Sequence, residues 1–202
     1  QNNRAQYGGV VYLTLTDILA NHTLIMIDND VLNNTATEDG GVVYSFATNV
    51  SQSVHLESNR FKGNVAVDGA VISMITPQLD MEMINNTIRD SMSTGLKGAV
   101  QLTTVSSLDL RDNVWTNNTV VEGSGANVWI QLVSDSQITI TNETSQNNHG
   151  VSSWFLTSMD ETVNQGNVWV DGMTLNDADA PHMLYIVLAA QVELKNVVLP
   201  QY

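Results

Sequence analysis

Hydrophobic and polar positions alternate along most of this chain, in short stretches that end at glycine, asparagine or aspartate. Alternation with a period of two predicts half-buried β-strands, and no stretch shows the 3.6-residue period of a helix. One set of predicted strands follows a glycine, as in "GVVYSFA" at 41–47 and "GAVISMI" at 69–75. A second set lies further on in each unit, as in "SVHLES" at 53–58. The pattern therefore predicts an all-β protein.

The predicted strands recur at a regular spacing. The glycines that open the first strand of each unit are 27–32 residues apart, at Gly9, Gly41, Gly69, Gly98 and Gly125. A period near 28 residues over about seven units is typical of stacked repeats. A third short strand of each unit is expected to hold the apolar residues Val31, Phe61, Ile88, Trp115 and Val198. Three strands in each unit predict a right-handed parallel β-helix of about seven coils, with roughly 28 residues per coil.

A leucine-rich repeat is the alternative fold. The segment "VSSLDLRDNVW" at 105–115 matches the phrase L-x-x-L-x-L-x-x-N-x-L of that repeat. The rest of a leucine-rich unit usually carries a helix or a regular apolar arc, whereas here it is a β-strand that follows a glycine. The β-helix is therefore the favoured interpretation.

A recurring asparagine motif, N-x-(apolar)-x-x-N, is expected to form the corners of the coils. Asparagine tolerates left-handed or bridging backbone, and stacked asparagine side chains can form a hydrogen-bonded ladder. Glycine is expected where the backbone turns without room for a Cβ. The predicted corner residues are Asn29, Asn59, Asn64, Asn86, Asn113 and Asn118, with Gly41, Gly69 and Gly98.

The strands that follow the glycines predict an aromatic stripe on the outer surface. If Val11, Leu13 and Leu15 point inward, Tyr12 points outward, and neighbouring parallel strands lie about 4.8 Å apart. The equivalent positions give a stripe of Tyr12, Tyr44, Ile72, Gln101, Trp129, Trp154 and Tyr185. Aromatic residues exposed in a row indicate a binding surface, either for another protein or for sugar rings, unless loops cover them.

The second strands predict a different, charged and solvated face. Its outward positions are His55, Glu57, Asp80, Glu82, Asp109, Arg111, Glu193 and Lys195. The whole chain has seven Lys and Arg against 21 Asp and Glu, a formal charge of −14, which disfavours nucleic acid as a partner. Cysteine is absent, which excludes disulfides and thiolate chemistry, and no apolar run is long enough to insert into a membrane.

Candidate chemistry is sparse. Polysaccharide-cleaving β-helices need clustered aspartates beside basic residues, but the basic residues here are scattered and no paired-Asp segment accompanies "NNHG" at 147–150. The histidines lie in different coils without zinc-ligand spacing. Asp171, Asp177 and Asp179 form an oxygen-rich stretch that we interpret as a solvated loop. We therefore expect no catalytic residues, no metal and no cofactor.

Sequons of the type N-x-S/T begin at six asparagines, which is close to the number expected by chance. They are Asn21, Asn33, Asn49, Asn85, Asn117 and Asn142. Each is a possible glycosylation site if the chain is secreted by a eukaryotic cell.

The glycine and asparagine signals together resemble the repeats of the polymorphic outer membrane proteins. The glycine signal is "GGVV" at 8–11 and 40–43 and "DGAV" at 68–71, and the asparagine signal is "FKGN" at 61–64 and "WTNN" at 115–118. The resemblance covers about residues 1–130 well and implies a pectin-lyase-like β-helix exposed outside a cell. The family's autotransporter barrel has no counterpart in these residues.

The expected protein is a non-enzymatic, extracellular or cell-surface β-helix formed by residues 1–202 as one domain, and a section of a longer solenoid. It would act as a rigid scaffold, filament component or adhesin through the aromatic stripe. Its expected partners are other protein surfaces or copies of itself, with glycans as a further option. The alternative is a β-helix that binds or cleaves carbohydrate.

Overall fold

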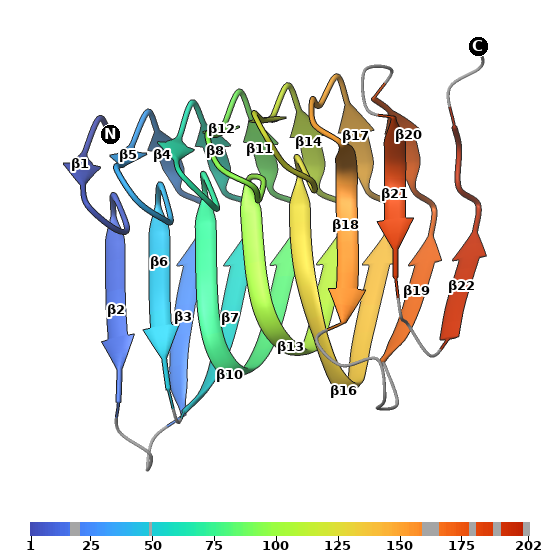
Figure 1. The fold of residues 1–202 in the computed structure, drawn as a ribbon, viewed down its shortest axis with the longest axis horizontal. Helices are drawn as coiled ribbons and strands as arrows, with labels where there is room; N and C mark the ends of the chain where they lie inside the picture. The colour runs from blue at the N-terminus through green and yellow to red at the C-terminus, as the bar shows by residue number, and fades with distance from the viewer. Residues whose placement is uncertain (17–20, 49, 159–165, 178–180, 188–190, 200–202) are drawn as a thin grey trace.

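The computed structural model describes residues 1–16, 21–48, 50–158, 166–177, 181–187 and 191–199. It is an all-β parallel solenoid of about 6 turns, spaced roughly 29 residues apart. The coils stand in a row along the long axis of the molecule, with the two chain ends at opposite ends of the row (Figure 1). The predicted fold class is confirmed, with slightly fewer turns than the sequence period indicated. Within the described ranges, no helix is long and apolar enough to cross a membrane.

Three parallel sheets run along the described part of the solenoid. The two smaller sheets have one strand from each of successive coils, whereas the largest holds both strand sets, as two strands or as one long strand in each coil. The first contains β1 (Arg4–Ala5), β5 (Thr35–Ala36), β9 (Val65–Ala66), β12 (Met92–Ser93) and β15 (Thr119–Val120). The largest contains β2 (Val11–Leu15), β6 (Val43–Ala47), β10 (Ile72–Ile84), β13 (Val100–Arg111), β16 (Val128–Thr141), β18 (Ser152–Ser158), β21 (His182–Ile186), β3 (His22–Ile27), β7 (Ser51–Glu57), β19 (Asn167–Asp171) and β22 (Gln191–Lys195). The third contains β4 (Asp30–Leu32), β8 (Arg60–Lys62), β11 (Thr87–Arg89), β14 (Val114–Thr116), β17 (Thr144–Gln146) and β20 (Thr174–Asn176).

The two predicted strand sets are joined in the middle coils. β10, β13 and β16 are 13, 12 and 14 residues long and curve from one face of the solenoid to the next (Figure 1). The pairing of β10 with β13 shifts register between Ile75 and Leu79, where the strand bends. Pro77 lies in this bend, as expected because proline cannot donate a hydrogen bond to a neighbouring strand.

Alternate residues of every strand point inward and stack on their equivalents in the next coil. Val54, Met81, Leu108, Ile138 and Val168 form one such column, and each is at most 3% exposed. The third strands add a column that the sequence predicted, Val31, Phe61, Ile88 and Trp115, all buried. The remaining predicted member, Val198, is exposed and forms only an isolated bridge to Thr174.

A ladder of asparagines, buried except for Asn29 at its start, lines the corner before the third strands. The backbone N and Nδ2 of Asn29, Asn59 and Asn86 each donate to Oδ1 of the asparagine in the next coil, over 2.8–3.1 Å. Asn113 donates in the same way to Oε1 of Glu143, over 3.0 and 2.8 Å. The indole Nε1 of Trp115 donates to the other carboxylate oxygen of Glu143. The predicted ladder is confirmed at this corner, and it ends at a carboxylate.

A second ladder follows the third strands. Asn3 donates to Asn34 and Asn34 to Asn64, after which Ser91 interrupts the side-chain series. The series resumes at Asn118, whose backbone N donates to Asn148, and Asn148 donates to the buried carboxylate of Asp177. Both ladders therefore run from amide to amide toward the C-terminus and terminate on a carboxylate, a group that only accepts.

The left-handed backbone at these corners belongs to the residue before each ladder asparagine. At the first corner, Asp28, Ser58, Asn85 and Asp112 have φ of 54–58°. The prediction that the ladder asparagines themselves adopt left-handed backbone is wrong, because their side chains must point inward to reach the next coil. Of the predicted corner glycines, Gly69 has φ of 61°. A Cβ on Gly98 would lie 1.8 Å from the carbonyl oxygen of Gly125, which explains the small residue there.

Candidate functional site

A single outward column on the first half of the large sheet contains most of the described aromatic residues that are exposed or partly exposed, although the exposed Phe46 and Trp169 lie elsewhere. Cross-strand pairing places one residue from each coil in this outer column: Tyr12, Tyr44, Ser73, Gln101, Trp129, Phe155 and Tyr185. The prediction placed Tyr12, Tyr44, Gln101, Trp129 and Tyr185 correctly in this column.

Ile72 and Trp154 do not belong to the predicted stripe. Ile72 pairs with Val43 and Val100, and Trp154 pairs with Val128. Both side chains are 0% exposed and form part of the core. Their outward places are taken by the next residue of each strand, Ser73 and Phe155.

The error comes from the glycine used to align the coils. The glycines that share left-handed backbone at this corner are Gly8, Gly40, Gly69 and Gly125, with φ of 55–70°. Each precedes its outer-column residue by four positions. Alignment on Gly9, Gly41 and Gly98 mixes this position with the next one, and a shift of one residue moves a side chain to the opposite face of the sheet. Gly69 corresponds to the first glycine of the "GG" pairs at 8–9 and 40–41, and counting four residues from it identifies Ser73.

The rings of the outer column form two separate clusters. At the N-terminal end, Tyr12 and Tyr44 stack with centroids 5.7 Å apart and planes 9° apart, and Tyr7 packs 4.8 Å from Tyr44. We call Tyr7, Tyr12 and Tyr44 the tyrosine cluster. Toward the C-terminal end, Phe155 stacks on Trp129 at 6.2 Å and on Tyr185 at 5.1 Å.

The two clusters are separated by small and polar side chains. Ser73 and Gln101 are 0% and 1% exposed, and the Ser73 hydroxyl donates to Oε1 of Gln101 over 3.1 Å. The aromatic surface is therefore interrupted in the middle, in contrast to the near-continuous stripe that the sequence predicted.

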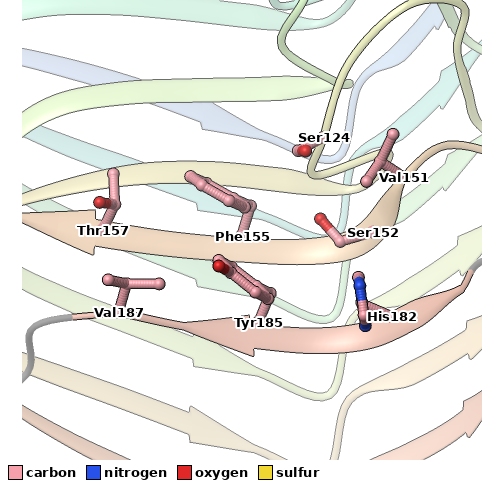
Figure 2. Close-up of a pocket in the computed structure, with 8 residues that line it drawn as sticks. All are labelled: Ser124, Val151, Ser152, Phe155, Thr157, His182, Tyr185 and Val187. Carbon is pink, nitrogen blue, oxygen red and sulfur yellow. The ribbon is translucent and has the colours of Figure 1, made fainter.

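A shallow groove with a volume of about 380 Å³ lies over the C-terminal ring cluster. Figure 2 shows Phe155 and Tyr185 side by side at its centre, with Ser152 and His182 toward one end. The His182 ring lies 5.6 Å from the Tyr185 ring. The groove combines aromatic surface with hydroxyl and imidazole groups, which suits a ligand with both apolar and polar edges. Tyr7, Phe155 and His182 were not among the residues predicted for the site.

The charged face lies on the second half of the large sheet, at the predicted positions. His55 contacts Glu82 at 2.7 Å and Glu57 at 3.1 Å, which links β7 and β10. Arg111 forms an ion pair with Glu82 and contacts Asp109 at 3.0 Å. Hydrogen bonds that His55 donates to the carboxylates of Glu57 and Glu82 raise its pKa above the usual 6.5. These contacts make an ion-pair network across three coils, as expected of a solvated structural face.

The described sequons follow from corner geometry. Asn33, Asn85, Asn117 and Asn142 all have φ of 53–54°, and each precedes a buried ladder residue. The threonine that completes each sequon begins a short strand, where a β-branched residue is favoured. All four of these asparagines are exposed. Asn21 is also exposed, and Asn49 lies outside the described residues.

Asp177 does not lie in a solvated loop, contrary to the prediction for the aspartate-rich stretch. Asp177 is fully buried, where its carboxylate accepts hydrogen bonds from Ser145 and Asn148. Asp171 ends β19, and Asp179 lies outside the described residues. Within the described ranges, no group of three or more His, Asp or Glu side chains is arranged to hold a metal ion.

Comparison with known proteins gives no relative. Models of protein families, curated proteins and solved structures all fail to match the chain.

Proposed function

We propose that this protein is a rigid, non-enzymatic β-helix outside the cell, which contacts other proteins through the aromatic rings of its outer column. The observation that carries this proposal is the alignment of rings from successive coils on one face. Tyr12 and Tyr185, near opposite ends of the column, are 56% and 40% exposed. Exposed aromatic residues are the side chains most enriched at the centres of protein interfaces.

Rigidity supports a role as a scaffold, filament component or adhesin. The parallel sheets, the stacked core columns and the two amide ladders connect every coil to the next, so that contacts on the surface are held at fixed positions. This role requires no conformational change. Binding specificity would depend on which side chains the rigid surface exposes.

The placement outside the cell rests on the repeat type. The glycine and asparagine signals that resemble those of the polymorphic outer membrane proteins occupy the strand starts and the corners of this solenoid. That correspondence supports a surface-exposed β-helix of the same general kind, while the finer assignment to that repeat type is part of the proposal.

The proposal can be tested with an array that carries purified secreted and surface proteins, the protein itself and a set of glycans. The fluorescently labelled protein is expected to bind protein spots, and the double variant Tyr44→Ala with Trp129→Ala is expected to lose this binding while it keeps its circular dichroism spectrum. Protein binding that is equal for the double variant and the parent would refute a role for the outer column.

Carbohydrate is the second candidate ligand because of the groove over Phe155 and Tyr185. Aromatic rings beside hydroxyl and imidazole groups can stack on a sugar and bind its hydroxyl groups. Binding restricted to glycan spots, and lost on Phe155→Ala, would favour this alternative. An assay for newly formed unsaturated or reducing ends would then separate carbohydrate binding from cleavage.

A further inference from the structure

Two outward tryptophans of the solenoid are each covered by a lysine of the same chain. Lys97 Nζ lies 4.7 Å from the ring centroid of Trp129, and Lys195 Nζ lies 4.3 Å from that of Trp169. Each is a cation–π contact, in which the negative face of the ring attracts the ammonium group. Each lysine also has a carboxylate partner, Asp68 at 3.9 Å and Glu193 at 2.7 Å. The fold thus uses a ring and a carboxylate together to hold a cation.

The tyrosine cluster has the ring and the carboxylates of this arrangement, without a cation over its rings. Tyr12 is 56% exposed, and no cation–π contact to the cluster exists among the described residues. Backbone hydrogen bonds place both carboxylate residues beside Tyr7, because Glu38 N donates to Gln6 O over 2.9 Å and Gly8 N donates to Asp39 O over 3.2 Å. Burial raises the pKa of Tyr44, and the charge of Asp39 raises it further. Asp39 is also near Glu38 and Asp68, and burial followed by the charge of Asp68 raises its pKa.

The lysine whose charge acts on Asp39 already contacts other groups. Lys97 acts on Asp39, but its ammonium group contacts Asp68 and Trp129. Neither Glu38 nor Asp39 has an ion pair in the described part of the chain, and Glu38 is exposed. The N-terminal end of the outer column therefore presents three rings beside two carboxylates, those of Glu38 and Asp39, that have no ion pair among the described residues.

We infer that the tyrosine cluster and the carboxylates of Glu38 and Asp39 bind arginine side chains of a basic protein segment. This inference rests on the proposed function and names the chemistry of its partner. Net charge selects this occupant over a second copy of the chain, because two molecules of charge −14 repel each other. Arginine fits better than lysine, since its planar guanidinium can stack on a ring and bind a carboxylate with two N–H groups at once.

The test uses two ten-residue peptides, one of alternating glycine and arginine and one in which neutral citrulline replaces every arginine. Binding of each to the protein is measured by isothermal titration calorimetry at low and physiological salt. We expect the arginine peptide to bind and the citrulline peptide not to bind. Tyr12→Leu should weaken arginine-peptide binding about two- to fivefold, the range expected when one exposed cation–π contact is lost.

Charge-matched variants locate the site. Asp39→Asn is expected to weaken binding at least as much as Tyr12→Leu, whereas Asp80→Asn, which removes one exposed charge from the other face, should leave the affinity unchanged. Equal binding of the two peptides would overturn the inference. So would equal losses in Asp39→Asn and Asp80→Asn with no loss in Tyr12→Leu, since binding would then come from net charge alone.

The outcome is separable from that of the proposed function. If the array shows protein binding that depends on the outer column while the arginine peptide fails to bind at the tyrosine cluster, the proposed function stands and the basic partner is refuted. If the peptide binds at the cluster but array binding does not change in the outer-column double variant, the arginine site stands and the proposed role of the outer column is refuted.

Discussion

Glu143 should make the stability of this fold depend on pH through one buried carboxyl group. The side chain is fully buried at the end of the first ladder. Burial raises its pKa from 4.5 to about 7, against the opposing effect of hydrogen bonds from Trp115 and Asn113. The carboxyl group is therefore more easily ionised in the unfolded chain than in the folded one.

The sign and size of the effect follow from that difference. Between pH 4.5 and about 7 the unfolded chain loses the proton while the folded chain retains most of it, so the free energy of unfolding falls as pH rises. At about 1.4 kcal/mol for each pH unit, the separation of the two pKa values corresponds to about 3 kcal/mol. The full stabilisation relative to alkaline pH is present below pH 4.5 and is lost above about pH 7.

The variant Glu143→Gln should remove this component. Its Oε1 can still accept from Asn113, but its amide would meet the indole N–H of Trp115, so the variant is expected to be less stable at acidic pH. The decisive quantity is the slope and not the absolute stability. Urea unfolding of parent and variant, followed by circular dichroism from pH 4 to pH 9, measures that slope.

Titration of the other carboxylates is common to both proteins and cancels in their difference. The gap between parent and Glu143→Gln should narrow by about 3 kcal/mol from low to high pH. Asp80→Asn, in which an exposed carboxylate is removed, should give a curve nearly parallel to that of the parent. Parallel curves for the parent and Glu143→Gln would refute the raised pKa of Glu143.

Three further predictions concern the core, the ladder and the charged face. Trp154→Ala should cost about 3–5 kcal/mol of stability, whereas Phe155→Ala should cost much less because its ring is partly exposed. Similar losses for the two variants in thermal or urea unfolding would contradict the assigned register. Asn86→Ala leaves the backbone N and Nδ2 of Asn59 without an acceptor and should cost roughly 1–3 kcal/mol of stability for each. Asn86→Asp, which keeps an acceptor oxygen, should lose less stability in the same unfolding assay. His55→Gln should lower stability below pH 6.5, where the ion-paired imidazolium stabilises the fold, and its effect should disappear as pH rises through the raised pKa of His55. A loss of stability that does not depend on pH would argue against the contact with Glu82.

The repeat period and the strands could be predicted because the same alternation of hydrophobic and polar residues recurs from coil to coil. Alternation placed Val54 and Leu56 inside and His55 outside, and recurrence of the same pattern about 28 residues apart predicted the stack. The ladders were predictable in kind, since a buried asparagine at the same corner of each coil can bond only to its neighbours above and below.

Other features have no local signal. The two-residue strands such as β5 are too short to show a period, and their pairing depends on the corners around them. Tyr44 and Ile72 look alike by alternation, and only the left-handed glycine four positions before the outer column separates them. Asp177 was expected to be solvated because aspartate usually is, but the open end of an amide ladder supplies the donors that make its burial possible.

The amide ladders give the solenoid a direction. In the first ladder, each asparagine donates to the side-chain oxygen of the next coil, and from Asn59 onward Nδ2 also donates to a backbone carbonyl of the preceding coil. The side-chain series therefore ends in donors at its C-terminal end, where Glu143 accepts from Asn113 and Asp177 accepts from Asn148. A coil duplicated between Asn29 and Asn113 would find an acceptor below it and a donor above it. A duplicated copy of the Glu143 coil would place one carboxylate against another inside the core. We therefore expect this fold to accept duplication of coils that precede Glu143 and to reject duplication of the coil that contains it.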